Sequence, residues 1–172
     1  MTIIFVRIKK ACKSSNIERP VISFFQDAIV QPPFSWVLEL GQGKVQLGAQ
    51  DQGGWAIKIN ETIVSIQNKN DCTFILPILE ANRKLFFDSL GKCPVALEQK
   101  NSFPEALLLS NAFSHRGSDY WAAKAIEWID DDWREIPEMQ KVFASVPTEK
   151  NWSQRVRHEF RKLKKKIEQE SS

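Results

Sequence analysis

Two histidines, His115 and His158, are the only imidazoles in the chain. With Lys162, four residues after His158, they supply the residue types of a metal-free nuclease, in which one imidazole accepts a proton and the other donates one. The histidines are 43 residues apart, so the fold would have to bring them into one pocket. A nuclease using His115 and His158 is therefore an alternative function to be tested against the fold.

A run of cations near the C-terminus suggests a second kind of chemistry. Its seven side chains fall within 12 residues and are Arg155, Arg157, Arg161, Lys162, Lys164, Lys165 and Lys166. Such density can neutralise phosphates and would make nucleic-acid affinity strongly salt-dependent. No aromatic side chain is interleaved on the charged faces to stack bases, and no helix-turn-helix, RNP or zinc-finger pattern accompanies the run. The alternatives are a nucleic-acid-binding helix and a solvated or partner-docking face.

An acidic cluster flanked by tryptophans precedes this run, and it comprises Glu127, Trp128, Asp130, Asp131, Asp132 and Trp133. On a helix over residues 119–134 these anions crowd the C-terminal end, where the dipole disfavours them, and Glu127 repels Asp131 at i,i+4. Places where local energetics oppose the sequence are candidate functional sites, and Trp is enriched in interface hot spots. We expect a docking surface for a basic protein. The alternative is an intramolecular contact with the basic helix.

Other catalytic and metal-binding patterns are missing from the sequence. There is no GxSxG, HExxH, P-loop or GxGxxG motif. Adjacent carboxylates at i, i+1 and i+2 point apart, which disfavours a divalent-metal site at residues 130–132. The three cysteines, Cys12, Cys72 and Cys93, form no CxxC pair or Cys/His cluster, so we expect reduced thiols without zinc. We predict no metal, no cofactor and no enzymatic activity.

The first 75 residues have the pattern of β-structure. Alternating or β-branched runs occupy residues 2–8, 20–25, 36–40, 44–47, 55–59 and 62–66. Gly41-Gln42-Gly43 fits a hairpin loop with positive φ, Asn60-Glu61 fits a turn, and Gln31-Pro-Pro33 breaks the chain. Together they predict an antiparallel meander with one face buried.

From Pro77 onward the apolar period becomes helical. We expect helices over residues 77–90, 102–113, 119–134 and 152–169, with a short segment between Pro137 and Pro147. Ser102 and Glu105 fit a capping box. The last helix has the clearest pattern, a narrow seam that must dock on something: Trp152, Val156, Phe160, Leu163 and Ile167. Strands followed by four to five helices predict the α+β class.

Length and composition fit one domain spanning residues 1–172, with a mainly β part (1–75), a helical part (76–149) and a basic terminal helix (150–172). Net charge is +3, yet residues 117–149 hold three basic and eight acidic side chains, and residues 150–172 hold eight basic and three acidic. The sequence contains no apolar stretch of about 18 residues, so we expect no membrane-spanning helix. The run Ile3–Val6 is too short for a secretory leader, so we expect a cytoplasmic protein.

In general build the chain resembles the immunity proteins of bacterial contact-dependent toxin systems. The similar features are the missing leader, the missing catalytic set and the charged, Trp-flanked segment Glu127–Trp133. The resemblance implies a non-enzymatic inhibitor that neutralises a toxin by direct binding, with a basic toxin domain as its partner and no membrane partner. The carboxylates would steer the partner and Trp128 or Trp133 would anchor it.

Overall fold

Residues 4–5, 22–93, 102–114, 118–129, 137–146 and 152–170 are described by the computed structural model. The chain divides into a sheet unit, Met1–Gln67 with Glu80–Pro104, and a helical unit, Asn68–Leu79 with Glu105–Ser172. The sequence predicts a change from strands to helices near residue 75, and this residue lies in Asn68–Leu79, which belongs to the helical unit. The class is α+β, as predicted, whereas the assignment of residues 1–172 to a single domain stays a prediction.

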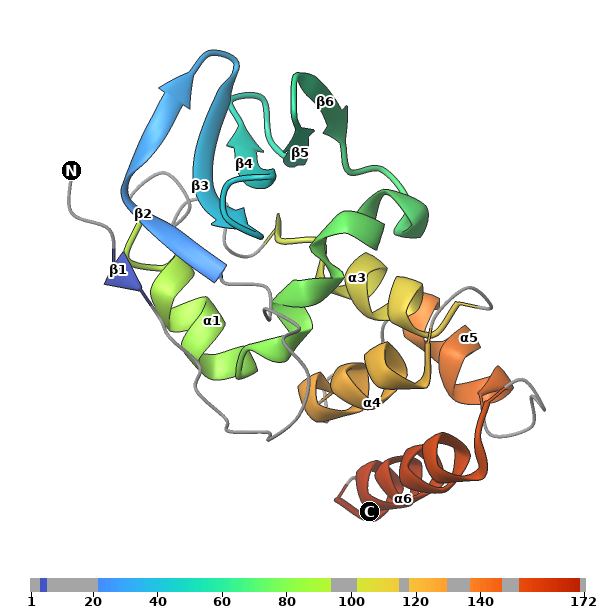
Figure 1. Cartoon of the computed structure of the whole chain (residues 1–172). Coiled ribbons are helices and arrows are strands. Elements are labelled where there is room, and N and C mark those ends of the chain that lie inside the picture. The colour runs from blue at the N-terminus through green and yellow to red at the C-terminus, as the bar shows by residue number, and fades with distance from the viewer. Residues whose placement is uncertain are drawn as a thin grey trace, which may run out of the picture. The chain divides into compact units, whose positions relative to one another are not determined.

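The sheet unit contains six antiparallel strands that follow one another in sequence order across a single sheet (Figure 1). The strands are β1 (Ile4–Phe5), β2 (Ile22–Gln31), β3 (Phe34–Leu40), β4 (Val45–Gln50), β5 (Trp55–Ile59) and β6 (Thr62–Ser65). This confirms the predicted meander. Because each strand pairs with its neighbours in sequence, short turns suffice to join β2 through β6.

The turns of the meander occur where glycine, asparagine and proline predict them. Gly41, Gln42 and Gly43 all have positive φ in the loop between β3 and β4, and Asn60 has a φ of 54° between β5 and β6. Positive φ is inexpensive for glycine and asparagine, which explains why these residues set the register of the hairpins. The Pro32-Pro33 pair ends β2 at Gln31.

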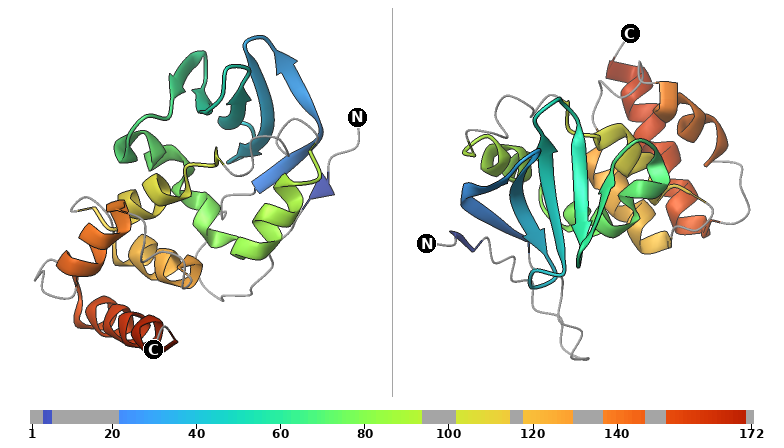
Figure 2. Two further views of the ribbon diagram at one scale, coloured as in Figure 1. Left: turned by 180° about the vertical axis from the view of Figure 1, so that it is seen from behind. Right: turned by 90° about the horizontal axis from the view of Figure 1, so that it is seen from above.

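The centre of the sheet is buried on both faces, which differs from the predicted single buried face. A register shift on β3 pairs Trp36 with Gly48 and Leu38 with Leu47. Because Leu47 and Gly48 are neighbours on β4 and point to opposite faces, Trp36 and Leu38 do so too, and both are at most 1% exposed. Within the sheet unit, α1 (Arg83–Leu90) packs its Phe86 ring against Phe24 of β2 at 5.7 Å between centroids. Figure 2 shows this unit from two further sides.

The predicted helix over residues 77–90 is interrupted. A 3-10 helix, η1, spans Lys69–Glu80 and contains Pro77, and α1 begins only at Arg83. Asn82 is the N-cap of α1, because its side-chain oxygen accepts a hydrogen bond from the Leu85 backbone nitrogen at 3.1 Å. Gly91 ends α1 as expected, but in the right-handed conformation, with a φ of −68°.

The described residues of the helical unit form η1 up to Leu79 and four α-helices. They are α3 (Glu105–Ala112), α4 (Asp119–Trp128), α5 (Pro137–Ser145) and α6 (Gln154–Glu170). Helix α3 begins at Glu105, later than the predicted start at residue 102, while the predicted capping pair of Ser102 and Glu105 stays a prediction. Phe103 precedes Pro104, and a residue before proline is disfavoured in helical conformation. Phe103 instead contributes its ring to the sheet unit, 5.5 Å from Trp55.

Helix α4 is shorter than its predicted range of 119–134. Ser118 caps its start, and the helix ends at Trp128, since the backbone of Ile129 is extended with a ψ of 129°. The three aspartates that follow are poor helix formers and would lie at the negative end of the dipole. Ending the helix before them avoids that penalty.

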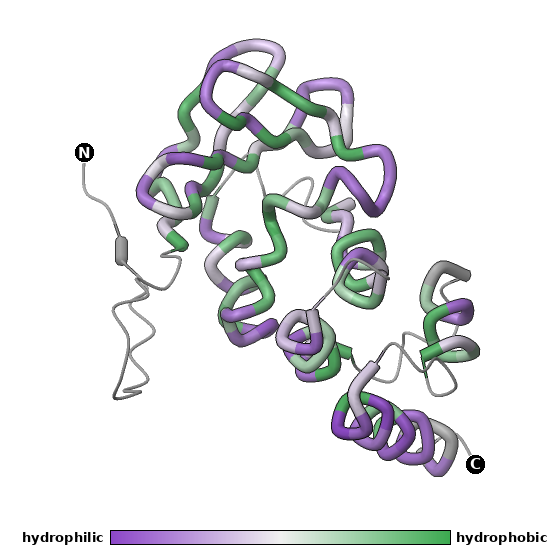
Figure 3. Tube along the Cα trace, turned by 45° about the vertical axis from the view of Figure 1, so that its right-hand side comes forward, coloured by the Kyte–Doolittle hydropathy of each residue, from purple (hydrophilic) through white to green (hydrophobic). Residues whose placement is uncertain are grey.

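Helix α6 is the longest α-helix in the described segments and is hydrophilic over most of its length (Figure 3). Its predicted seam is confirmed at Trp152, Val156 and Phe160, which are at most 4% exposed, whereas Leu163 is only half-buried. The Phe160 ring lies 5.2 Å from the rings of both Phe113 and Phe143. None of the described helices is long and apolar enough to cross a membrane.

Candidate functional site

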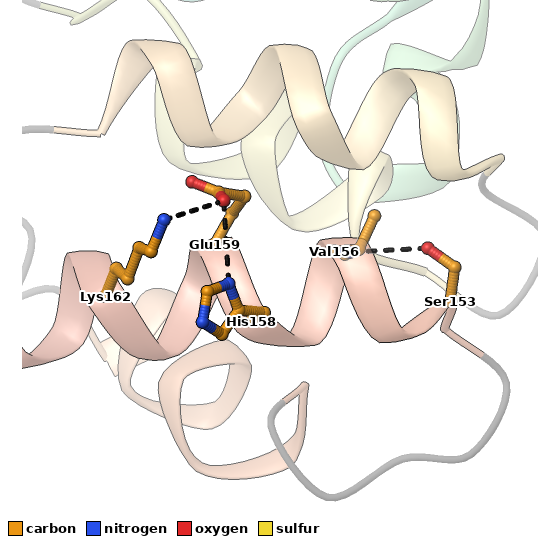
Figure 4. Close-up of polar contacts among 5 residues, drawn as sticks. All are labelled: Ser153, Val156, His158, Glu159 and Lys162. Carbon is orange, nitrogen blue, oxygen red and sulfur yellow. Dashed lines mark hydrogen bonds and ion pairs between the residues drawn. The ribbon is translucent and has the colours of Figure 1, made fainter.

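The basic helix α6 is held in place by a cap and by its apolar seam. The Ser153 hydroxyl accepts a hydrogen bond from the Val156 backbone nitrogen at 3.3 Å (Figure 4). The Ser153 backbone nitrogen donates to the Asp119 carboxylate at 3.4 Å, which ties the start of α6 to the first residue of α4. The seam residues Val156 and Phe160 are buried, so the opposite side of the helix must face outward.

All seven predicted cationic residues lie on α6. Six of them are exposed and Arg157 is half-buried. The exposed ones are Arg155, Arg161, Lys162, Lys164, Lys165 and Lys166. These cations lie on the sides of α6 outside the seam, so the exposed surface of the helix is predominantly positive along several turns.

Among the side chains of α6 that the structure describes, one anion interrupts this surface. Glu159 accepts a hydrogen bond from Lys162 Nζ at 3.2 Å, and its Oε1 lies 3.7 Å from His158 Nδ1 (Figure 4). The hydrogen bond and the charge of Lys162 lower the pKa of the Glu159 carboxyl. The glutamate therefore remains ionised at neutral pH and partly neutralises Lys162.

The N-terminal half of α6 borders a hollow that the sequence analysis did not identify. Its volume is about 500 Å³, and the described residues that line it are Gln154, Arg155, Arg157, His158 and Arg161. Most of them recur at intervals of three and four residues, which places them on one side of a helix, away from the seam. This spacing was the available signal. Gln154 was not predicted, because the sequence analysis selected only charged side chains on this helix.

Arg157, one of the residues that line this hollow, has an unsatisfied donor. Its Nε is closed off from solvent and has no hydrogen-bond acceptor in the part of the chain that the structure describes. A buried donor without an acceptor costs about 1–3 kcal/mol. An oxyanion is the type of ligand that would supply this acceptor, because carboxylate and phosphate oxygens match the planar guanidinium.

The acidic cluster is described only at its start. Glu127 is exposed and pairs with Lys124 Nζ at 2.8 Å. Trp128 is 2% exposed, so the prediction that it serves as a surface anchor is wrong. This side chain is in the core because it lies on the inner side of α4 with Ala125. Asp130, Asp131, Asp132 and Trp133 lie outside the described residues.

The end of α4 also changes the energetic argument for the cluster. The predicted repulsion between Glu127 and Asp131 required both residues to lie on one helix, four positions apart. The helix ends at Trp128, so that requirement is not met. The cluster is therefore less anomalous than its sequence suggests, and its candidacy rests on its charge and on Trp133.

The nuclease alternative requires two imidazoles, of which the structure describes one. His158 is exposed on α6, with 63% of its side chain accessible. His115 lies outside the described residues. A general acid or base is most effective where burial or neighbouring charges tune its pKa. The open position of His158 does not favour such a role.

Metal and thiol chemistry find no support in the residues that are described. Across these segments, no group of three His, Cys, Asp or Glu side chains could hold a metal ion. Cys72 and Cys93 are free and buried, and Cys12 lies outside the described residues. Burial, helped by the charge of Asp71, raises the pKa of the Cys72 thiol to about 12, which suppresses the reactive thiolate.

In comparisons with known proteins, no family model, no curated protein and no solved structure matches this chain.

Proposed function

We propose that this is a non-enzymatic binding protein that captures nucleic acid through the cationic surface of α6. The observation that carries the proposal is that all seven predicted cations lie on one helix, six of them exposed, while a buried seam fixes the helix in place. Cys72 and Cys93 are free thiols, as expected for a protein in the reducing cytoplasm.

A docked and capped helix suits such a role because it is already ordered before binding. Less conformational entropy is then lost when its side chains meet phosphates. At about 1.5 Å per residue, the cationic stretch from Arg155 to Lys166 extends over roughly 17 Å. Phosphates contacted in this way fix position and carry no sequence information, so we expect binding without strong sequence preference.

The proposal predicts a steep dependence on salt. If four to six phosphates of duplex DNA are neutralised, log K falls with log[salt] with a slope of roughly −4 to −5. Affinity should then drop about 10²- to 10³-fold between 50 and 200 mM salt. Fluorescence anisotropy with labelled duplex DNA and with single-stranded RNA measures this slope.

Two matched variants locate the binding surface. Lys164→Gln with Lys165→Gln removes two exposed charges from α6, and Lys44→Gln with Lys84→Gln removes two exposed charges from the sheet unit. We expect the first pair to weaken binding at least tenfold and to flatten the salt slope by about two, with little effect of the second. Equal effects of the two pairs, or no binding at low salt, would contradict the proposal.

A second candidate function is an immunity-type inhibitor that binds a basic toxin domain through the acidic cluster. Glu127 supports it, because 62% of its side chain is exposed at the end of α4. In this proposal Glu127 and Asp130–Asp132 steer the partner, and Trp133 replaces the buried Trp128 as the apolar anchor.

Capture from nuclease-treated lysate of the source cell separates this candidate from nucleic-acid binding. An inhibitor should retain one basic protein that is lost with Asp131→Lys plus Asp132→Lys and kept with Lys164→Gln plus Lys165→Gln. A protein kept by both pairs, or lost only with the lysine pair, argues against the acidic cluster as its docking surface.

A further inference from the structure

We infer that the hollow on the N-terminal half of α6 binds a terminal phosphomonoester of a nucleic-acid strand. The inference rests on the proposed nucleic-acid function and adds a preference for strand ends over strand interiors. The hollow is lined by Gln154, Arg155, Arg157, His158 and Arg161, and its volume is about 500 Å³.

The charge of the hollow matches a phosphomonoester better than a phosphodiester. A phosphodiester in the interior of a strand carries a single negative charge on two free oxygens. A phosphomonoester carries about −1.5 to −2 at neutral pH and presents three acceptor oxygens. Three guanidinium groups border this one hollow, and each offers paired N–H donors that can hold two oxygens of one phosphate.

The size of the hollow is suited to a small ligand. Ligand-binding pockets usually measure roughly 300–1,000 Å³, so 500 Å³ accommodates a phosphate with part of its terminal nucleotide. Gln154 adds an amide that can donate to a phosphate oxygen or accept from a sugar hydroxyl. A continuous strand would instead meet the helix along its length, where the lysines lie.

Arg157 supplies the second observation. Its Nε is buried and has no acceptor among the described residues, although the side chain lines the hollow. A rotation of the Arg157 side chain that presents Nε and one Nη to a phosphate would satisfy this donor. Arg157 is thus the residue for which binding a phosphate changes the hydrogen-bonding state most.

The C-terminal half of α6 offers a different kind of surface. Lys164 and Lys165 are exposed and do not line the hollow. Ammonium groups act as point charges without the planar fork of arginine, so they are suited to phosphodiesters in general. The helix therefore combines an arginine hollow that selects strand ends with a lysine surface that does not.

The test compares three short single-stranded DNA oligonucleotides of one sequence: unmodified, 5′-phosphorylated and 3′-phosphorylated. Their affinities for the full-length chain are measured by competition in fluorescence anisotropy at low salt. We expect at least one phosphorylated form to bind about tenfold more tightly than the unmodified form. Arg155→Gln with Arg157→Gln should bring this ratio close to one, while circular dichroism confirms unchanged helix content.

The matched control removes the same charge outside the hollow. Lys164→Gln with Lys165→Gln should weaken binding of all three oligonucleotides and leave the ratio intact. Equal binding of the three by the unmodified chain overturns the inference and leaves the proposed function standing, whereas no binding of any overturns the proposed function itself. Adenosine 5′-monophosphate competing as strongly as the phosphorylated strand overturns the assignment to strand ends in favour of free nucleotides.

Discussion

Arg157 and Lys162 lie on the same helix in different electrostatic states. Lys162 donates to Glu159 at 3.2 Å, so part of its charge is already neutralised, whereas the Nε of Arg157 has no acceptor among the described residues. A ligand gains most from a cation whose hydrogen bonds are unmade, because no existing bond has to be broken. At the scale of single residues, the anion preference of α6 therefore centres on Arg157.

Glu159 is the residue that should limit this preference. Replacing it with glutamine removes the one described acidic side chain on the cationic surface and releases Lys162. We expect Glu159→Gln to tighten nucleic-acid binding about two- to fourfold at low salt, a modest effect because the interaction between two solvent-exposed charges is weak. Glu61→Gln, an exposed position in the sheet unit, is the control and should change nothing. An unchanged affinity for Glu159→Gln would place the bound strand away from this turn.

Cys72 gives a residue-scale prediction about pH. Burial raises the pKa of its thiol from 9.0 to about 12, so the unfolded chain loses this proton at a lower pH than the folded chain does. Its contribution to stability is complete below pH 9 and is lost as the pH rises toward 12, by about 1.4 kcal/mol per pH unit at most. Urea unfolding between pH 8 and about 10.5 should show a smaller decline for Cys72→Ala than for the unmodified chain. Parallel declines would contradict the raised pKa.

At the scale of elements, the seam of α6 explains why a highly charged helix is ordered. The Phe160 ring is fully buried and contacts rings from α5 and from the residue that follows α3. Without such packing an isolated helix of this length is marginal in water. The cationic surface thus depends on a few apolar side chains on the opposite side of the helix.

Phe160→Ala tests that dependence. Removing a fully buried ring should lower the free energy of unfolding by about 3–5 kcal/mol, measured in urea. Leu85→Ala is the control, because Leu85 is 56% exposed and should cost under about 0.5 kcal/mol. A loss below 1 kcal/mol for Phe160→Ala would mean that the ring is not part of a packed core.

The success of sequence-based prediction also differs from element to element. The sheet could be predicted because its turns are set by local conformational preferences, such as positive φ at Gly41 and Gly43. The seam of α6 was visible because one apolar side repeats over four turns. Helix boundaries were less predictable, because Phe103 joins a ring cluster far away in the sequence and Asn82 starts a helix inside an apparently continuous pattern.

The candidate site could be predicted in its composition but not in its geometry. All seven cations were identified from their density in the sequence. Trp128 was assigned to the surface because of its acidic neighbours in the sequence, although it lies on the inner side of α4 with Ala125. The hollow needed coordinates, since it is defined by which of the long side chains border a common space. The orphan donor of Arg157 has no sequence signature.

At the scale of the whole molecule, the two units are interleaved along the chain. Residues 80–104 belong with the sheet although they follow η1, most of which belongs to the helical unit. They provide Phe86, which packs on Phe24, and Phe103, which lies edge-on to Trp55. The predicted β part, residues 1–75, therefore lacks side chains that complete the core of its own sheet.

This arrangement predicts how fragments behave. A fragment of residues 1–75 should fail to unfold cooperatively, because Phe24 and Trp55 would lose their aromatic partners and a large ring removed from a core costs about 3–5 kcal/mol, a large share of the 5–15 kcal/mol that stabilises a whole domain. A fragment of residues 1–104 retains these contacts and should give a sigmoidal urea transition. Both fragments contain Trp36 and Trp55, so tryptophan fluorescence serves as one probe for the pair. A cooperative transition in the shorter fragment would show that the sheet is stable without α1 and Phe103.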